Sequence, residues 1–236
     1  MSAPRSHPNP LLRHLRMPAG TPAPSAYYRT CRRILQVLLC ALWGVRVFDR
    51  HHEPASGSVL YVCNHQSYLD PMLMSFALRR PMNYMAADFL FAPPGFRRLI
   101  RSLNAFPVRR GVGDTRAMKE SLRRLKVGGQ LVVFAEGTRT WDGRIGAFLP
   151  GVALLARRAA DWTVPVVIDG AFEAWPRTQR LPRCGRVTVQ YGRPRNGAHC
   201  RATEPQELLD ELRDEMLAIQ ADLRRRTGRP SLHYLS

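Results

Sequence analysis

Apolar residues in this chain form short continuous runs that alternate with stretches of helical periodicity. The runs at residues 59–63, 130–135 and 164–168 are apolar at nearly every position, which is typical of strands buried on both faces of a parallel sheet. Residues 186–192 alternate between apolar and polar side chains and indicate a further strand. Weaker patterns predict short strands at 82–87 and 106–111, with an irregular stretch at 88–105 between them.

The periodic segments between the runs indicate helices. Asp114 is a favourable N-cap for one of them, and another is expected to open at Thr203, with Gln206 three residues on in capping-box spacing. Strands that alternate with helices predict an α/β fold: one layered domain over residues 49–236, with a mostly parallel central sheet flanked by helices. The expected helices are residues 72–78, 114–127, 150–160 and the segment from 203, whose apolar stripe is Leu208, Leu212, Met216, Ile219 and Leu223.

The N-terminal region is expected to differ from this domain. Residues 1–26 are rich in Pro, Ser and Arg without periodicity and predict a mobile basic arm. Residues 27–48 predict a helix that is apolar on nearly all faces at its centre and flanked by arginines. The apolar run is shorter than the roughly 20 residues that cross a bilayer, so we expect a helix that lies in the membrane interface. A buried core helix is the alternative, and the Phe-Arg-rich stretch at 89–101 leaves the same two possibilities open.

The net positive charge of the chain indicates which classes of molecule it binds. Lysine and arginine total 36 against 18 acidic residues, a formal net charge of +18, and such an excess favours acidic partners such as anionic lipids, phosphorylated substrates, an acidic carrier protein or nucleic acid. Aromatic residues do not interleave with the basic ones, which argues against nucleic acid. The five cysteines are odd in number and lack C-x-x-C spacing, which indicates a reducing compartment without disulfides or structural zinc.

His65 and Asp70 are the first candidates for chemistry. They stand between the run at 59–63 and the helix expected from residue 72, and Pro71 suits a first helical turn. In a regular helix the two side chains would point about 140° apart, so they meet only if His65 precedes the helix and Asp70 reaches back from its first turn. A histidine oriented by a carboxylate is a general base. The alternative is a structural histidine beside an aspartate that caps the helix.

Four short blocks in order resemble the glycerolipid acyltransferases typified by lysophosphatidic acid acyltransferase. Asn64-His65-x-x-x-x-Asp70 resembles the first block of that family, the H-x4-D motif. Residues 106–110, Phe-Pro-Val-Arg-Arg, resemble the second block, and residues 134–139, Phe-Ala-Glu-Gly-Thr-Arg, resemble the third, usually F-P-E-G-T-R. Residues 164–166 are similar to the fourth. The chain departs from the family at Arg109, where many members have Asp, and at Ala135, Asn104 and Asp169, where Pro, Gly and Pro are common.

The resemblance implies an O-acyltransferase of phospholipid biosynthesis that moves a fatty acyl group from acyl-CoA or acyl carrier protein to a lysophospholipid hydroxyl. It implies a catalytic pair of His65 and Asp70, and no metal or other cofactor. It places the acceptor's phosphate on Arg110, and the remaining substrate-binding residues are Glu136, Gly137, Thr138 and Arg139. Membrane lipids would be further partners, and the expected location is the cytoplasmic face of the inner membrane.

Several alternatives stay open beside this reading. In one alternative, Glu136 and Arg139 pair only with each other as a structural bridge. Backbone N–H groups near His65 or Gly137 are candidates for stabilising an oxyanion. The alternative acceptor is a lysolipid without a phosphate, such as a lyso-aminolipid. In a different class, the chain would be a non-catalytic basic protein that binds membranes or nucleic acid.

Overall fold

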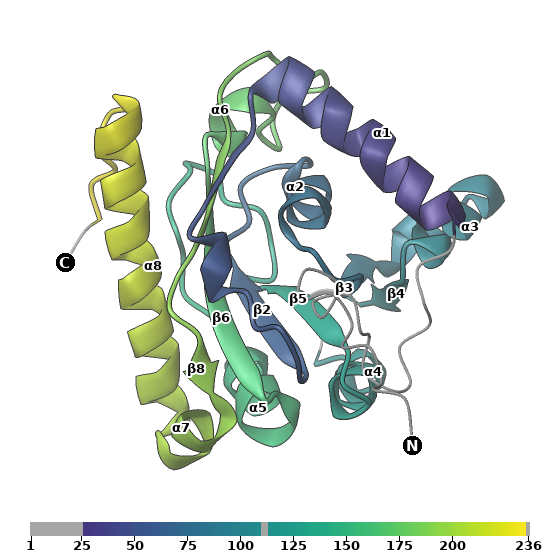
Figure 1. Ribbon diagram of the computed structural model, residues 1–236, viewed down its shortest axis with the longest axis vertical. Coiled ribbons are helices and arrows are strands. Elements are labelled where there is room, and N and C mark those ends of the chain that lie inside the picture. The colour runs from purple at the N-terminus through teal and green to yellow at the C-terminus, as the bar shows by residue number, and fades with distance from the viewer. Residues whose placement is uncertain (1–25, 110–112, 235–236) are drawn as a thin grey trace, which may run out of the picture.

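The structure is a computed structural model that describes residues 26–109 and 113–234 (Figure 1). In these residues eight strands form one sheet in the order β1-β7-β6-β2-β5-β3-β4, and β8 pairs with the start of β6. The pairs among β6, β2, β5, β3 and β4 are parallel, whereas β7 and β8 run antiparallel to β6. The strands are β1 (Arg46–Phe48), β2 (Val59–Cys63), β3 (Met82–Ala87), β4 (Ala105–Val108), β5 (Gln130–Phe134), β6 (Trp162–Asp169), β7 (Thr188–Tyr191) and β8 (Arg195–Asn196).

Helices cover both faces of this sheet and enclose two apolar cores. The α-helices are α1 (Ala26–Trp43), α2 (Asp70–Ala77), α3 (Pro94–Ser102), α4 (Thr115–Lys126), α5 (Pro150–Ala159), α6 (Ala171–Ala174), α7 (Gly197–Ala202) and α8 (Pro205–Thr227), with short 3-10 turns η2 (Arg50–His52) and η3 (Asp88–Phe91). Alternate residues of β2 divide between the cores: Tyr61 packs with α1 and α2, whereas Leu60 and Val62 pack with α4, α5 and α8. The predicted α/β fold with a mostly parallel sheet is therefore confirmed.

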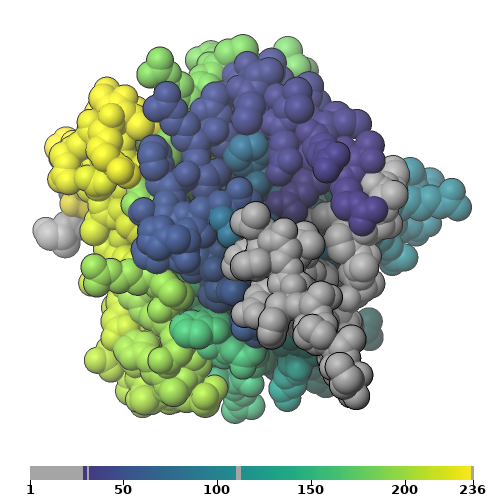
Figure 2. Space-filling model, viewed as in Figure 1, coloured from purple at the N-terminus to yellow at the C-terminus, as the bar shows by residue number. Residues whose placement is uncertain are grey.

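The N-terminal helix packs one face on the core, as the buried-helix alternative predicted, and leaves another face exposed. Leu39 and Trp43 are buried in the core beside α2, while Val37 and Leu38 on another face are 68% and 50% exposed. In Figure 2, side chains of α1 in purple form much of the visible face. The helix ends at Trp43 rather than at residue 48, because residues 46–48 pair with β7 as an edge strand. Among the helices of residues 26–109 and 113–234, none is long and apolar enough to cross a membrane.

Two further expectations need correction. The stretch expected to be irregular contains η3 and α3, whose exposed residues include Phe96 and Leu99. The last helix does not begin at Thr203 with a capping box, because Thr203 instead ends α7 and α8 begins at Pro205. Gln206 accordingly donates from its side-chain Nε2 to Asp210 Oδ1 at 2.9 Å, within the helix. The predicted stripe of α8 is correct, with Ile219 partly buried and the other four residues fully buried.

Candidate active site

The loop between β2 and α2 brings His65 and Asp70 together. Nδ1 of His65 lies 2.7 Å from Oδ2 of Asp70, and the same oxygen accepts the backbone N–H groups of Gln66 at 2.6 Å and Ser67 at 2.7 Å. Asp70 is the first residue of α2 and has no exposed surface. The two backbone N–H groups hold the carboxyl group of Asp70 in place, and its contact with Nδ1 orients the imidazole. Nε2 is then the ring nitrogen available for proton transfer.

The imidazole is fixed on its other side by β5. The His65 ring stacks on Phe134, with ring centres 4.1 Å apart and planes inclined by 16°. Asn64 ties the same loop to β6, because its side chain donates to the carbonyl of Ile168 and accepts from the N–H of Ile168, both at 2.8 Å. His65 is thus held at the carboxyl ends of three neighbouring strands, where open α/β sheets bind their ligands.

A mostly apolar cavity of about 480 Å³ lies beside His65. Its walls come from β5, the end of β4, α4 and the first turns of α5. Val132, Val133 and Phe134 form one side, and Met118 and Leu155 are among the residues opposite them. The size and the apolar lining are those of a pocket for a small hydrophobic ligand.

The residues after β5 turn sharply beneath the histidine. Gly137 has φ of +70°, a backbone conformation that favours glycine, and a Cβ there would also require Leu149 to shift. Glu136 Oε1 accepts the N–H of His65 at 3.0 Å, and its Oε2 accepts the N–H of Gly146 at 3.1 Å. Burial raises the pKa of Glu136 to about 7, although both backbone donors oppose the shift. Glu136 therefore braces the histidine loop.

Arg139 lies over the ring of Tyr68, with Cζ 3.6 Å from the ring centre. Its Nη1 is buried and has no hydrogen-bond partner among the described residues. The structure forms no ion pair between Glu136 and Arg139, both of which it describes, so the alternative of a simple structural bridge is wrong. A buried guanidinium nitrogen without an acceptor is suited to an anionic oxygen of a ligand.

Comparison with known proteins places the chain in a family. Residues 44–169, just over half of its 236 residues, match the Acyltransferase family. The chain belongs to the Acyltransferase family.

Sequence identity between this chain and individual members of the family is low. It is 29% identical over 114 residues to 1-acyl-sn-glycerol-3-phosphate acyltransferase of Bacillus subtilis, covering 48% of this chain and 57% of that protein. It is 28% identical over 144 residues to the chloroplastic 1-acyl-sn-glycerol-3-phosphate acyltransferase LPAT1 of Arabidopsis thaliana, covering 59% and 40%. The match thus spans about half the length of these relatives. The crystal structure of the 1-acyl-sn-glycerophosphate (LPA) acyltransferase PlsC of Thermotoga maritima has the same fold, with a TM-score of 0.73, 24% identity and coverage of 84% and 81%.

Within this member of the Acyltransferase family, most of the predicted site residues meet at one edge of the sheet. His65 lies in the loop after β2, Asp70 begins α2 at the end of that loop, and Glu136, Gly137 and Arg139 lie in the loop after β5. Thr138 of the same loop is exposed to solvent. Arg110 lies outside the described residues.

The backbone groups expected to hold an oxyanion are already engaged. The N–H of His65 donates to Glu136, and the N–H of Gly137 donates to the carbonyl of Phe134 at 3.0 Å. The next two N–H groups after His65, those of Gln66 and Ser67, are held by Asp70. The expectation that these groups face a substrate is therefore not supported.

Sequence reasoning missed three residues that build this acyltransferase site. Asn64 and Phe134 were noted only as parts of the first and third blocks and given no role, yet both fix the histidine loop. Gln66 is fully buried and bonds the carbonyl of Gly143 at 2.9 Å, a contact across 77 residues of sequence. A run of polar residues directly after a buried strand was the available signal. Within the described ranges, no group of three or more His, Cys, Asp or Glu residues is placed to hold a metal ion.

Proposed function

We propose that this protein transfers a fatty acyl group from a thioester to the hydroxyl of a lysophospholipid of the 1-acylglycerol-3-phosphate type. The observation that carries the proposal is the His65–Asp70 pair beside an apolar cavity, with an unpartnered guanidinium nitrogen of Arg139 on the neighbouring loop. The names of the Bacillus subtilis and Arabidopsis thaliana relatives support the same acceptor class.

His65 acts as the general base in this reaction. Nε2 takes the proton of the acceptor hydroxyl while that oxygen attacks the carbonyl carbon of the thioester. The resulting imidazolium is stabilised by Asp70, which accepts the Nδ1 hydrogen bond at 2.7 Å. The C–S bond then breaks, the new ester remains, and the proton returns from Nε2 to the departing thiolate. The product pair is a diacylated lipid and a free thiol.

The cavity receives the acyl chain and the arginines receive the phosphate. A chain laid along Val133 and Leu155 brings its carbonyl end to His65, because the histidine is part of the same cavity wall. Arg139 Nη1 contacts a phosphate oxygen of the acceptor. The resemblance of residues 106–110 to the second block gives Arg110 the same role. Both acyl-CoA and acyl carrier protein are acidic donors suited to a chain of net charge +18.

The membrane is the source of the acceptor, and α1 is the element that docks on it. Its outer face presents Ile34, Val37, Leu38 and Leu42, which are 56%, 68%, 50% and 43% exposed. The exposed Arg33 adjoins these residues and pairs with anionic head groups. Since the inward face of the same helix belongs to the core, α1 would lie along the membrane surface rather than cross it. The membrane surface in this proposal is the cytoplasmic face of the inner membrane.

A thiol-release assay tests the reaction. Purified protein is mixed with vesicles containing 1-acylglycerol 3-phosphate and either palmitoyl-CoA or palmitoyl-acyl carrier protein, and free thiol and diacylated lipid are measured. We expect equal amounts of both products, and neither with His65→Ala. A lyso-aminolipid tested in parallel distinguishes the acceptor classes. Absence of product with every acceptor and donor would refute the proposal.

A further inference from the structure

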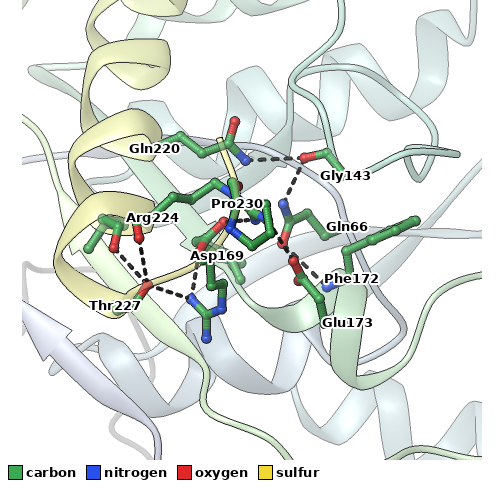
Figure 3. Close-up of polar contacts among 12 residues, drawn as sticks. Gln66, Gly143, Asp169, Phe172, Glu173, Gln220, Arg224, Thr227 and Pro230 are labelled. Atoms are coloured by element: carbon green, nitrogen blue, oxygen red, sulfur yellow. Dashed lines mark hydrogen bonds and ion pairs between the residues drawn. The ribbon is translucent and has the colours of Figure 1, made fainter. Parts of the chain in front are cut away.

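Helix α8 reaches the histidine loop through buried hydrogen bonds. The Acyltransferase match ends at Asp169, so α8 lies beyond it. Gln220 of α8 is 1% exposed, and its Nε2 donates to the carbonyl of Gly143 at 3.1 Å. Nε2 of Gln66 donates to the same carbonyl at 2.9 Å, and Gln66 directly follows His65. Figure 3 shows both amides directed at this one oxygen.

The residues after α8 complete the connection. The hydroxyl of Tyr234 donates to Oε1 of Gln220 at 2.5 Å and accepts the N–H of Ile145 at 2.9 Å. Arg213 of α8 donates from Nε to the carbonyl of Gly146 at 3.0 Å. The segment of residues 140–146, here named the bracing segment, is therefore held along one side by α8 and Tyr234.

The other side of the bracing segment holds the backbone of His65. At one end, the N–H of Thr140 donates to the carbonyl of His65 at 2.8 Å. At the other end, Gly146 donates to Oε2 of Glu136, and Oε1 of Glu136 accepts the N–H of His65. Both backbone polar groups of His65 thus depend on the position of the bracing segment, one of them directly and one through Glu136.

Tyr234 is itself fixed by the start of the C-terminal tail. Gly228, with φ of +68°, ends α8 and turns the chain back along the helix. Nε of Arg224 donates to the carbonyl of Pro230 at 2.6 Å, and Nη1 of Arg229 donates to Oδ2 of the buried Asp169 at 2.6 Å. These contacts hold the tail close to α8 as far as Pro230, four residues before the tyrosine.

We propose that Gln220 and Tyr234 are positioning residues, which set the place of His65 through the bracing segment. The kinetic part of this inference rests on the proposed acyl transfer. Neither side chain lines the cavity, so neither contacts a bound acyl chain. Their loss shifts the base relative to the acceptor hydroxyl without removing a substrate contact, and displacements of about 1 Å cost up to 100-fold in rate. The expected change is in kcat rather than in KM.

The test compares two substitutions of the same chemical kind. Tyr234→Phe removes the hydroxyl that joins Gln220 to Ile145, and we expect kcat to fall about tenfold with both KM values within about twofold of the parent. Tyr191→Phe is the control, because the Tyr191 hydroxyl is also buried but has no hydrogen-bond partner among the described residues. It should keep the parental kcat. Adding Gln220→Met to Tyr234→Phe should cost much less than Gln220→Met alone, since both act through one connection.

Hydrogen exchange supplies a readout that needs no activity. In Tyr234→Phe, the amides of His65, Ile145 and Gly146 should exchange faster, while those of β6 keep the parental rate. Faster exchange only at Ile145 together with an unchanged kcat would overturn the inference, and so would a rise in KM without a fall in kcat. If the parent protein transfers no acyl group, the proposed function fails alone. The exchange rate at His65 then decides whether the connection exists.

Discussion

Arg139→Ala should weaken binding of a phosphorylated acceptor far more than binding of the donor. Nη1 of Arg139 is buried and has no acceptor in the part of the chain that the structure describes, and Cζ lies 3.6 Å from the ring centre of Tyr68, so the group is oriented before any ligand arrives. A hydrogen bond between charged groups contributes roughly 2–3 kcal/mol under these conditions. At 1.4 kcal/mol per factor of ten, the acceptor KM should rise about 30- to 150-fold.

Two companion variants show whether the effect comes from this guanidinium. Arg139→Lys should recover only part of the loss, because an ammonium is a point charge without the planar fork. Arg144→Ala removes an equal charge five residues away, where the arginine pairs with Asp142 at 3.6 Å and does not line the cavity. We expect this control to change the acceptor KM less than about twofold.

The assay is thiol release at varied acceptor, with 1-acylglycerol 3-phosphate and monoacylglycerol compared at saturating acyl donor. The loss in Arg139→Ala should appear only with the phosphorylated acceptor. An equal loss with monoacylglycerol would refute the reasoning, since that acceptor has no phosphate for Arg139 to hold. A rise in the donor KM alone would place Arg139 at the donor instead.

Three further predictions concern the base, its support and the membrane. His65→Ala should abolish acyl transfer and leave the circular dichroism spectrum unchanged. Asp70→Asn should lower kcat almost as far, because the imidazolium loses its counter-charge. Parental turnover by either variant would refute the mechanism. The raised pKa of Glu136, about 7, means that its contribution to stability is complete below the unfolded-state value and is lost as the pH rises toward 7. Urea denaturation should therefore show the parent losing on the order of 3 kcal/mol relative to Glu136→Gln between pH 4.5 and pH 7, and parallel stability curves would contradict this. Substituting the exposed Val37 and Leu38 of α1 by Asp should lower binding to anionic vesicles in a flotation assay without unfolding the protein, and undiminished flotation would contradict a role for this face.

From the sequence alone, deletion of the N-terminal segment would be the obvious test of membrane binding. The structure shows that point substitutions in α1 are the better test. Removing residues up to 48 would also delete Leu39 and Trp43, which are 1% and 7% exposed in the core, and β1, which pairs with β7. Loss of membrane binding by such a truncation would report unfolding as much as detachment. Only the structure separates the two faces of the helix.

The elements that the sequence predicted well are those with a local signal. Continuous apolar runs marked β2, β5 and β6 because strands in the middle of a parallel sheet are buried on both faces. Edge strands such as β1 have three residues and depend on a partner far along the chain, here β7, so their own sequence carries little information. The start of α8 was misplaced because Pro205 opens the helix, whereas Thr203 closes the short helix before it.

The contacts of the site also divide into those with a local sequence signal and those without one. The spacing of His65 and Asp70 was sufficient to predict their contact, since the geometry of a strand, a turn and a first helical turn is local. The contact between Gln66 and Gln220 through Gly143 joins residues 77 positions apart on either side, and no local pattern encodes it. Asn104, which stands where relatives often have glycine, adopts φ of +66°, a conformation that asparagine tolerates better than most residues.

Asp169 joins the C-terminal helix α8 and the tail after it to strand β6, which supports the site. It stands at the end of β6, where the resemblance to the fourth block leads one to expect proline, and its side chain is fully buried. Burying an unpaired carboxylate would be strongly unfavourable, but Arg224 of α8 and Arg229 of the tail each donate to one of its oxygens, at 2.8 and 2.6 Å. A proline side chain could accept neither arginine. Without the aspartate, the buried Arg224 would keep only Glu173 and the carbonyl of Pro230 as partners, and Arg229 would lose its ion pair. The three residues therefore act as a unit, and this unit attaches the C-terminal helix to the strand whose Ile168 holds Asn64, the residue before the base.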